Sequence, residues 1–274
     1  MITLKQENAM EDAAAVIGGI IKMFHAANMP RLADESLYLG IPYPILTKFH
    51  EMLGTQRSED ENKRFRNRMR YAGIYKERTD NTFHWDGNTY PNAEPGIIEQ
   101  ALTLGFVRQK KNLIMVGPPG AGKTLLTVII ACKALREEFS VRYKTGHDIA
   151  TELQEMRVGN SLSGYINRMK SYDMLVIEDI TFSTPDNSTA QDFFSIIDKR
   201  CGRKTTLITT NGNVQKWASE FPDKAMYAAV IGRLCEDALM INMNGAEDMR
   251  LKLAKGMFFD VGGAASANGN QADV

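Results

Sequence analysis

Hydrophobic residues recur at helical spacing through the first part of the chain. The stretches MEDAAAVIGGIIKMFHAANM and PYPILTKFHEMLG carry apolar residues three and four positions apart, and no alternating strand pattern competes with them. Further along, Phe65 and Met69 lie on one apolar stripe of a third helical segment, whose remaining surface carries a run of basic side chains from Lys63 to Arg70. We therefore expect a small helical N-terminal domain over residues 1–80.

The pattern changes at about residue 96, where short apolar runs begin to alternate with helical stretches. The runs lie at residues 112–116, 140–144, 173–179, 205–211 and 239–244. Strands that alternate with helices predict an α/β fold, a parallel sheet covered on both faces. We expect this domain over residues 96–255. The segment 81–95 is rich in turn-forming residues and is predicted to be a linker, and the polar tail 256–274 is predicted to be disordered.

Composition narrows the class of protein without identifying it. The 274 residues are enough for one large domain or two modest ones. Lysine plus arginine equals aspartate plus glutamate, at 33 each, which argues against a uniformly basic protein but leaves local patches open. Three distant cysteines and four scattered histidines match neither a zinc site nor a disulfide framework. No membrane-length apolar run and no signal-peptide core are present, so a cytoplasmic protein without membrane contact is expected.

The strongest chemical signal is the stretch NLIMVGPPGAGKT, which matches G-x-x-x-x-G-K-[ST] between an apolar strand and a helical segment. Such a loop turns its backbone amides onto phosphate oxygens at a helix N-terminus, its lysine reaches the β- and γ-phosphates, and its threonine can bind Mg²⁺. The alternative is a plain glycine-rich turn between a strand and a helix, and the required context on both sides of the motif disfavours it. The candidate nucleotide-binding residues are Gly117, Pro118, Pro119, Gly120, Ala121, Gly122, Lys123, Thr124 and Leu125.

Polar residues follow two later strands, and arginines flank the last one. Glu178 and Asp179 end the third apolar run, and this strand end is the best candidate to supply the metal's outer shell and to orient a water; the alternative is a solvated strand end. Asn211 ends the fourth run and can bind the attacking water or the γ-phosphate, although Asn-Gly is also a common turn. Arg233 and Arg250 are candidates for contacts to a γ-phosphate, although lone arginines are more often surface ion-pair partners.

Several stretches together resemble the IstB/DnaC branch of the AAA+ ATPases. They are GPPGAGKT, YKTGHDIATELQEMR, YDMLVIED, LITTNGNVQKW and VIGRLCEDALMINMNGAEDMR, in the family's order over residues 90 to 255. The N-terminal stretches MPRLADESLYLGIP and AGIYKERTDNTFHW look more like IstB-type transposition helpers than DnaC-type helicase loaders. The resemblance implies an AAA+ P-loop ATPase with a five-stranded parallel sheet. It also implies ATP bound between neighbouring subunits of a homo-oligomer, in a ring or a spiral.

The resemblance also assigns roles to individual residues. It makes Lys123 and Thr124 the P-loop pair, and Thr124 and Glu178 the metal-facing residues. Asp179 becomes the water-activating acid and Asn211 the polar sensor. Arg233 becomes the arginine that reaches a neighbouring subunit's ATP, and Arg250 a second sensor. The family usually places aspartate before glutamate, and here the order is reversed. Asp179 is one methylene shorter than the usual glutamate, and a displacement of about 1 Å can cost about 10²-fold in rate. We therefore expect intact binding of ATP and Mg²⁺ with slow hydrolysis.

The segment between the second and third apolar runs is where the family faces DNA. The matching basic residues are Lys144, Arg157, Arg168 and Lys170. Contacts to phosphates position a protein without reading sequence. The alternative is a pair of ordinary amphipathic helices with solvated ends. The basic stretch from Lys63 to Arg70 is a second candidate, for DNA or for a partner protein.

Three functions compete at this point. The leading one is an ATPase that assembles on double-stranded DNA and assists a transposase in selecting or bending its target. A replicative helicase loader is the second, with a helicase in place of the transposase. The third is an ATP-gated DNA clamp or scaffold with little turnover, which the reversed acid pair keeps open. A small-molecule kinase is disfavoured because the sequence indicates no acceptor pocket.

Overall fold

The computed structural model describes residues 4–79, 83, 89–180, 187–211, 224–246 and 248. The chain divides into two compact units, Met1–Asn67 and Arg68–Val274. This division lies inside one long helix, whereas the sequence places the boundary near residue 80. Residues 68–79 thus belong with the sheet. The other predicted boundaries stay predictions, and the tail 256–274 lies outside the described residues.

The helices of the described chain differ widely in length, whereas the strands are uniformly short. The helical elements are α1 (Leu4–Ala26), η1 (Pro30–Leu32), η2 (Glu35–Leu37), α2 (Tyr43–Ala72), α3 (Ile97–Leu102), α4 (Gly105–Arg108), α5 (Lys123–Arg136), α6 (Gly146–Val158), α7 (Leu162–Ser171), α8 (Asn187–Arg200) and α10 (Lys224–Cys235). The strands are β1 (Leu113–Val116), β2 (Val141–Thr145), β3 (Met174–Glu178), β4 (Thr205–Thr210) and β5 (Leu239–Asn242). Among the described helices, none combines the length and the apolar character needed to cross a membrane.

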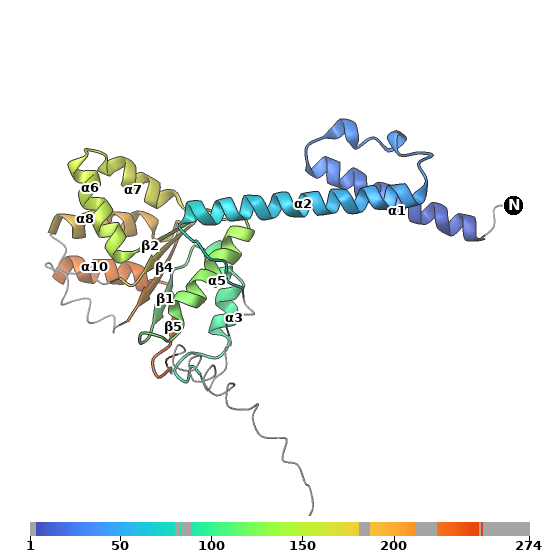
Figure 1. The fold of residues 1–274 in the computed structure, drawn as a ribbon. Coiled ribbons are helices and arrows are strands. Elements are labelled where there is room, and N and C mark those ends of the chain that lie inside the picture. Colours follow the sequence, from blue (N-terminus) through green and yellow to red (C-terminus); the bar gives the residue numbers. More distant parts are fainter. Residues whose placement is uncertain are drawn as a thin grey trace, which may run out of the picture. The chain divides into compact units, whose positions relative to one another are not determined.

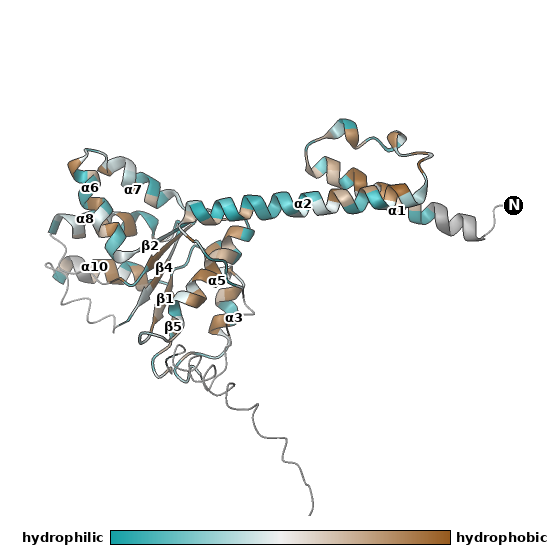
Figure 2. Cartoon of the chain, in the orientation of Figure 1, coloured by the Kyte–Doolittle hydropathy of each residue, from teal (hydrophilic) through white to brown (hydrophobic). Residues whose placement is uncertain are grey.

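The N-terminal unit has a small core of its own. Ile20 and Phe24 of α1 pack with Tyr38 and Leu46, and all four side chains are buried. The Tyr38 hydroxyl donates to the Leu32 carbonyl at 2.5 Å, which fixes the short helical turns against this core. Figure 2 shows apolar positions on these turns and on the first part of α2, and several of the apolar side chains in this region are exposed, among them Leu37, Leu39 and Ile45.

The second unit is built on a five-stranded parallel sheet with the strand order β2-β3-β4-β1-β5 (Figure 1). Each of the five apolar runs forms one strand, so the predicted fold class is confirmed. The central strands β1, β3 and β4 are almost wholly buried because they are paired on both sides and covered on both faces.

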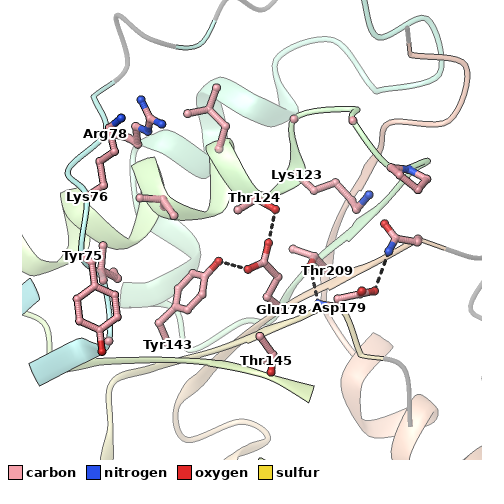
Figure 3. Close-up of a pocket in the computed structure, with 18 residues that line it drawn as sticks. Tyr75, Lys76, Arg78, Lys123, Thr124, Tyr143, Thr145, Glu178, Asp179 and Thr209 are labelled. Atoms are coloured by element: carbon pink, nitrogen blue, oxygen red, sulfur yellow. Dashed lines mark hydrogen bonds between the residues drawn. The ribbon is translucent and has the colours of Figure 1, made fainter. Parts of the chain in front are cut away.

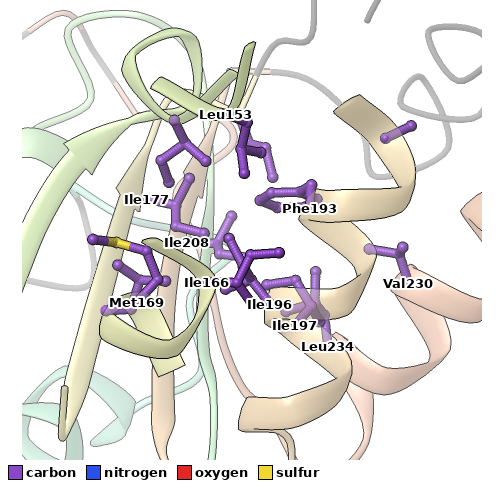
Figure 4. Close-up of a cluster of buried hydrophobic side chains, with 14 of the residues drawn as sticks. Leu153, Ile166, Met169, Ile177, Phe193, Ile196, Ile197, Ile208, Val230 and Leu234 are labelled. Atoms are coloured by element: carbon purple, nitrogen blue, oxygen red, sulfur yellow. The ribbon is translucent and has the colours of Figure 1, made fainter. Parts of the chain in front are cut away.

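Alternate residues of each strand face opposite layers of helices. Ile177 of β3 and Ile208 of β4 belong to a cluster with Phe193 of α8 and Leu234 of α10, as Figure 4 shows. Helices α6, α7, α8 and α10 therefore cover one face of the sheet, while α5 lies on the other (Figure 1). Residues of the opposite parity on β2 and β3 consequently point toward α5.

A buried arginine joins two of these helices to the sheet. The Arg200 side chain at the end of α8 is fully buried, and it donates to the carbonyls of Met169 at 2.7 Å and Tyr172 at 2.9 Å. It also donates to the Thr205 carbonyl at the start of β4. Burial lowers the pKa of Arg200 to about 9. The C-terminal end of α7 is thus fixed by a cation that satisfies backbone acceptors.

The parallel arrangement gathers the candidate residues at one edge. β1, β3 and β4 are neighbours, and their carboxyl ends lead into the glycine-rich loop, the acid pair and Asn211, respectively. Ligand sites of open parallel sheets lie at this edge.

Candidate nucleotide-binding site

The glycine-rich loop connects β1 to α5, whose first residue is Lys123. Gly122 precedes the helix with a φ of +92°, a left-handed conformation that strongly favours glycine. The buried Lys123 side chain folds back over the loop, where its Nζ donates to the carbonyls of Gly117 at 2.7 Å and Pro118 at 2.9 Å. The backbone amides at the start of α5 and the lysine are therefore gathered where an anion can bind.

Two aromatic residues hold the outer side of this loop, and neither was singled out from the sequence. The buried Tyr90 hydroxyl donates to the Ala121 carbonyl at 2.9 Å. The Phe83 ring stacks on Tyr90 with the ring centroids 5.8 Å apart. The segment predicted to be a linker therefore carries two anchors for the glycine-rich loop. The aromatic residues within this polar, turn-rich stretch were the available signal.

Glu178, the last residue of β3, lies beside the first turn of α5. One carboxylate oxygen accepts a hydrogen bond from the Thr124 hydroxyl, and the other accepts one from the Tyr143 hydroxyl of β2 (Figure 3). Burial, together with the hydrogen bond and negative charge of Glu178, raises the pKa of Tyr143 above its ordinary value. The tyrosine is consequently protonated at neutral pH and donates to the carboxylate.

Asp179 points in a different direction from Glu178. Its φ is +48°, a left-handed conformation that aspartate tolerates better than most residues. Its backbone amide donates to Thr209 Oγ1 at 3.0 Å, and its Oδ1 accepts from Asn211 Nδ2 at 2.8 Å. Glu178 thus pairs with the glycine-rich loop, while Asp179 pairs with the end of β4. The left-handed φ of Asp179 therefore directs the two adjacent acids to different hydrogen-bond partners.

These residues line a cavity of about 860 Å³. The predicted nucleotide-binding residues that face it are Pro119, Gly120, Gly122, Lys123, Thr124 and Leu125. Gly117, Pro118 and Ala121 are not among the lining residues, and their carbonyls instead accept the hydrogen bonds from Lys123 and Tyr90. Glu178, Asp179 and Asn211 lie in the same cavity wall, so residues from three strand ends meet at one site.

The opposite wall of the cavity was missed from the sequence. Residues 73–76 and Arg78 line it, directly after the end of α2. Gly73 has a φ of +92°, and a Cβ there would lie 2.9 Å from the Tyr143 carbonyl, so the chain crosses β2 in a way that excludes other residues. Lys76 and Arg78 add positive charge to this wall, and the Tyr75 side chain is 89% exposed.

Of the two candidate arginines, the structure describes Arg233, which stands apart from this cavity. Arg233 is exposed on α10, where its guanidinium lies 3.6 Å from the Asp198 carboxylate of α8. It is not among the residues that line the cavity of its own chain. The role expected of Arg233 concerns a neighbouring subunit and stays a prediction. Arg250 lies outside the described residues.

The candidate DNA-binding residues are distributed over β2, α6 and α7. Lys144 forms an ion pair with Glu152, and Arg157 forms one with Asp192. The exposed Arg168 lies over the Tyr165 ring, 5.6 Å from its centroid, and Lys170 is half-buried. Two of the four cations are therefore already paired within the chain. Their assignment to DNA stays a prediction.

The fold and the site together define a class of protein. The chain has a glycine-rich phosphate loop after β1, acids at the end of β3 and a polar residue at the end of β4, and its strand order is β2-β3-β4-β1-β5. These features place it among the AAA+ P-loop proteins. A family model described as IstB-like ATP binding protein matches residues 45–256. The chain belongs to this family.

Two relatives agree with this membership, and a solved structure agrees with the fold. One relative, from Bacillus thuringiensis subsp. berliner, is named as an ATP-binding protein of insertion sequence IS232. It is 28% identical over 168 residues, which cover 61% of this chain and 67% of that protein. The corresponding protein of insertion sequence IS5376 from Geobacillus stearothermophilus is 26% identical over 175 residues, or 64% and 68% of the two chains. AMPPCP-bound DnaA from Aquifex aeolicus superposes with a TM-score of 0.53 at 20% identity, covering 68% of this chain and 56% of that one. This last likeness shows the fold.

Proposed function

We propose that the chain binds ATP with Mg²⁺, hydrolyses it slowly, and couples the bound state to assembly on DNA in support of a transposase. One observation carries the nucleotide part of this proposal: the Thr124 hydroxyl meets the Glu178 carboxylate directly beneath the glycine-rich loop. The two side chains are 54 positions apart in sequence, yet they offer adjacent oxygen ligands. Oxygen ligands are those that Mg²⁺ prefers, so the residues present fit this ion.

Each residue of the cavity then has a defined task. The amides at the start of α5 and the ammonium of Lys123 bind phosphate oxygens, after Lys123 exchanges its contacts to the Gly117 and Pro118 carbonyls. Thr124 and Glu178 hold the metal ion, which neutralises charge on the phosphates when it is bound. Asp179 accepts a proton from the attacking water, and Asn211 orients the Asp179 carboxylate.

Slow hydrolysis follows from the position of Asp179. Its carboxylate is short, and its Oδ1 is already held by Asn211 at 2.8 Å. A general base must come within hydrogen-bond reach of its water, and an error of about 1 Å costs about 10²-fold. The proposal is therefore a nucleotide-bound state that persists while the protein is on DNA.

The transposition part of the proposal is supported by the relatives, which are named as proteins of insertion sequences. Among the candidate DNA contacts, the exposed Arg168 is the side chain most available for phosphates, because Lys144 and Arg157 are ion-paired. Arg233 is proposed to reach the nucleotide of a neighbouring subunit in a homo-oligomer. The exposed apolar side chains of the N-terminal unit, such as Leu39 and Ile45, fit a contact to the transposase.

The test is the size of the protein on duplex DNA, measured by light scattering with and without ATP. The proposal expects large oligomers that need both DNA and ATP. Lys123→Ala should abolish them, whereas Lys133→Ala, a lysine change on the same helix but outside the cavity, should not. A parent chain that stays monomeric under all conditions refutes the assembly model. Adding a transposase or a replicative helicase as the partner then separates the two kinds of ATPase.

A second candidate function, an ATP-gated DNA clamp with negligible turnover, is favoured by the same contact between Asp179 and Asn211. The two proposals differ in how the protein is released from DNA. If hydrolysis drives release, the lifetime on DNA should lengthen with a nonhydrolysable analogue. If the lifetime with ATP and with the analogue is equal, the clamp is the better description.

A further inference from the structure

Tyr143 occupies a place at the nucleotide site that neither the motif nor the predicted roles include. It lies on β2, the edge strand next to β3, and its partner in the pairing register is Val176. Glu178 is two residues beyond Val176 and therefore projects to the same face of the sheet. That face is the one toward α5, and both side chains line the cavity.

The two oxygens of Glu178 are used by different hydroxyl groups. Thr124 Oγ1 donates to one oxygen, and the Tyr143 hydroxyl donates to the other, as Figure 3 shows. Thr124 lies on the glycine-rich loop side of the carboxylate and is itself a candidate metal ligand. Tyr143 approaches from the sheet and can keep its contact whichever group lies on the Thr124 side.

The hydroxyl has a chemical reason to be there. A glutamate side chain has one more rotatable bond than an aspartate, so a carboxylate at the tip of a strand loses more freedom when it is fixed. A tyrosine ring is rigid, and its half-buried position on β2 leaves few orientations for the hydroxyl. The phenolic hydroxyl is therefore placed to donate to the Glu178 carboxylate.

We propose that Tyr143 is a positioning residue, which holds the Glu178 carboxylate in the orientation that binds the metal ion. This inference rests on the proposed function, because it concerns the same nucleotide site. It explains how a glutamate can serve as a metal ligand at a position where the family usually has an aspartate. Hydrogen bonds to a ligating carboxylate from outside the ligand set typically change metal affinity about 10- to 100-fold.

The experiment measures Mg²⁺ dependence rather than turnover. A fluorescent, nonhydrolysable ATP analogue is bound to the full chain, and Mg²⁺ is titrated from zero. Tyr143→Phe, which removes one oxygen and keeps the ring, should raise the half-maximal Mg²⁺ concentration about 10-fold. Its affinity for the analogue in EDTA should equal that of the parent, because Tyr143 contacts the carboxylate and not the glycine-rich loop.

A matched control and a double variant separate positioning from general loosening. Tyr165→Phe makes the same change at a second tyrosine, which is buried in the cluster on the opposite face of the sheet, and should titrate like the parent. Glu178→Asp shortens the side chain and withdraws its carboxylate from the tyrosine. In that background Tyr143→Phe should change the half-maximal Mg²⁺ concentration less than about 2-fold.

Three results overturn the inference. If Tyr143→Phe titrates like the parent, the hydroxyl does not position the ligand. If its effect is as large in the Glu178→Asp background, it acts through another group. A loss of affinity in EDTA equal to the loss in Mg²⁺ indicates a general disturbance of the cavity. By contrast, a parent chain that binds no analogue under any condition refutes the proposed function itself, so the two failures are distinguishable.

Discussion

The two adjacent acids, Glu178 and Asp179, are predicted to have different roles in the nucleotide site. Glu178 is paired with Thr124 of the glycine-rich loop, whereas Asp179 is paired with Asn211 at the end of β4. We therefore expect Asp179→Asn to reduce hydrolysis and Glu178→Gln to reduce the Mg²⁺ dependence of ATP binding. Both changes keep the size and shape of the side chain, so each removes mainly the negative charge.

The expected size follows from the geometry. A well-placed general base contributes about 10²- to 10⁴-fold. Asp179 is one methylene short and is held back by Asn211, so we place its contribution at the lower end, about 10²-fold or about 2.7 kcal/mol in the barrier. Asp179→Asn should thus lower the rate by about 10²-fold while the affinity for the Mg²⁺ complex of ATP stays within about 3-fold of the parent.

Single-turnover hydrolysis of radiolabelled ATP is the suitable assay, because it measures slow chemistry without a contribution from product release. Binding of a nonhydrolysable analogue at fixed Mg²⁺ supplies the affinity of each variant. If Asp179→Asn hydrolyses ATP as fast as the parent while Glu178→Gln is inactive, the roles are reversed. In that case Glu178 reaches the water itself, and the contact with Thr124 belongs to a resting arrangement.

Three further predictions test the cavity and the sheet. Lys123→Ala should weaken ATP binding at least about 10-fold, measured by fluorescence titration, because the site loses its central cation. Arg200→Leu should lower the free energy of unfolding in urea by about 3 kcal/mol or more, since it leaves buried carbonyls unpaired. Burial raises the pKa of Asp173, but hydrogen bonds from Lys204 and Ser140 outweigh this effect and lower the pKa to about 2. Asp173→Asn should therefore lower the free energy of unfolding by its full amount above about pH 4, and this difference from the parent should vanish as the pH falls toward 2.

Much of the fold could be predicted because the sheet is parallel. Strands buried on both faces must be apolar throughout, so the run from Met174 to Ile177 stands out from its flanking helices without any tertiary information. The glycine-rich loop was equally visible, since its chemistry is confined to consecutive residues. The strand order follows from neither feature; the family resemblance supplied the expected sheet.

The parts of the site that were missed are those made by residues distant in sequence. The hydroxyl of Tyr143 meets Glu178 across 35 positions, and the Tyr90 hydroxyl meets Ala121 across 31. A tyrosine on an amphipathic strand, or in a turn-rich segment, gives no sign of which backbone or carboxylate it will contact. The wall around Gly73 was hidden for a related reason, because the helical pattern of α2 continues up to it and suggests that it belongs to the N-terminal unit.

The order of the acids illustrates why sequence position alone does not assign chemistry. Adjacent residues on a regular strand project to opposite faces, so only one of two strand-end acids would point toward the glycine-rich loop. Here the strand ends at Glu178, and Asp179 leaves it with a φ of +48°, which directs its carboxylate to Asn211 instead of into the opposite helical layer. The backbone thereby brings both acids to one cavity. Because that torsion favours short polar side chains, an aspartate fits the second position better than a glutamate, even though its reach is shorter.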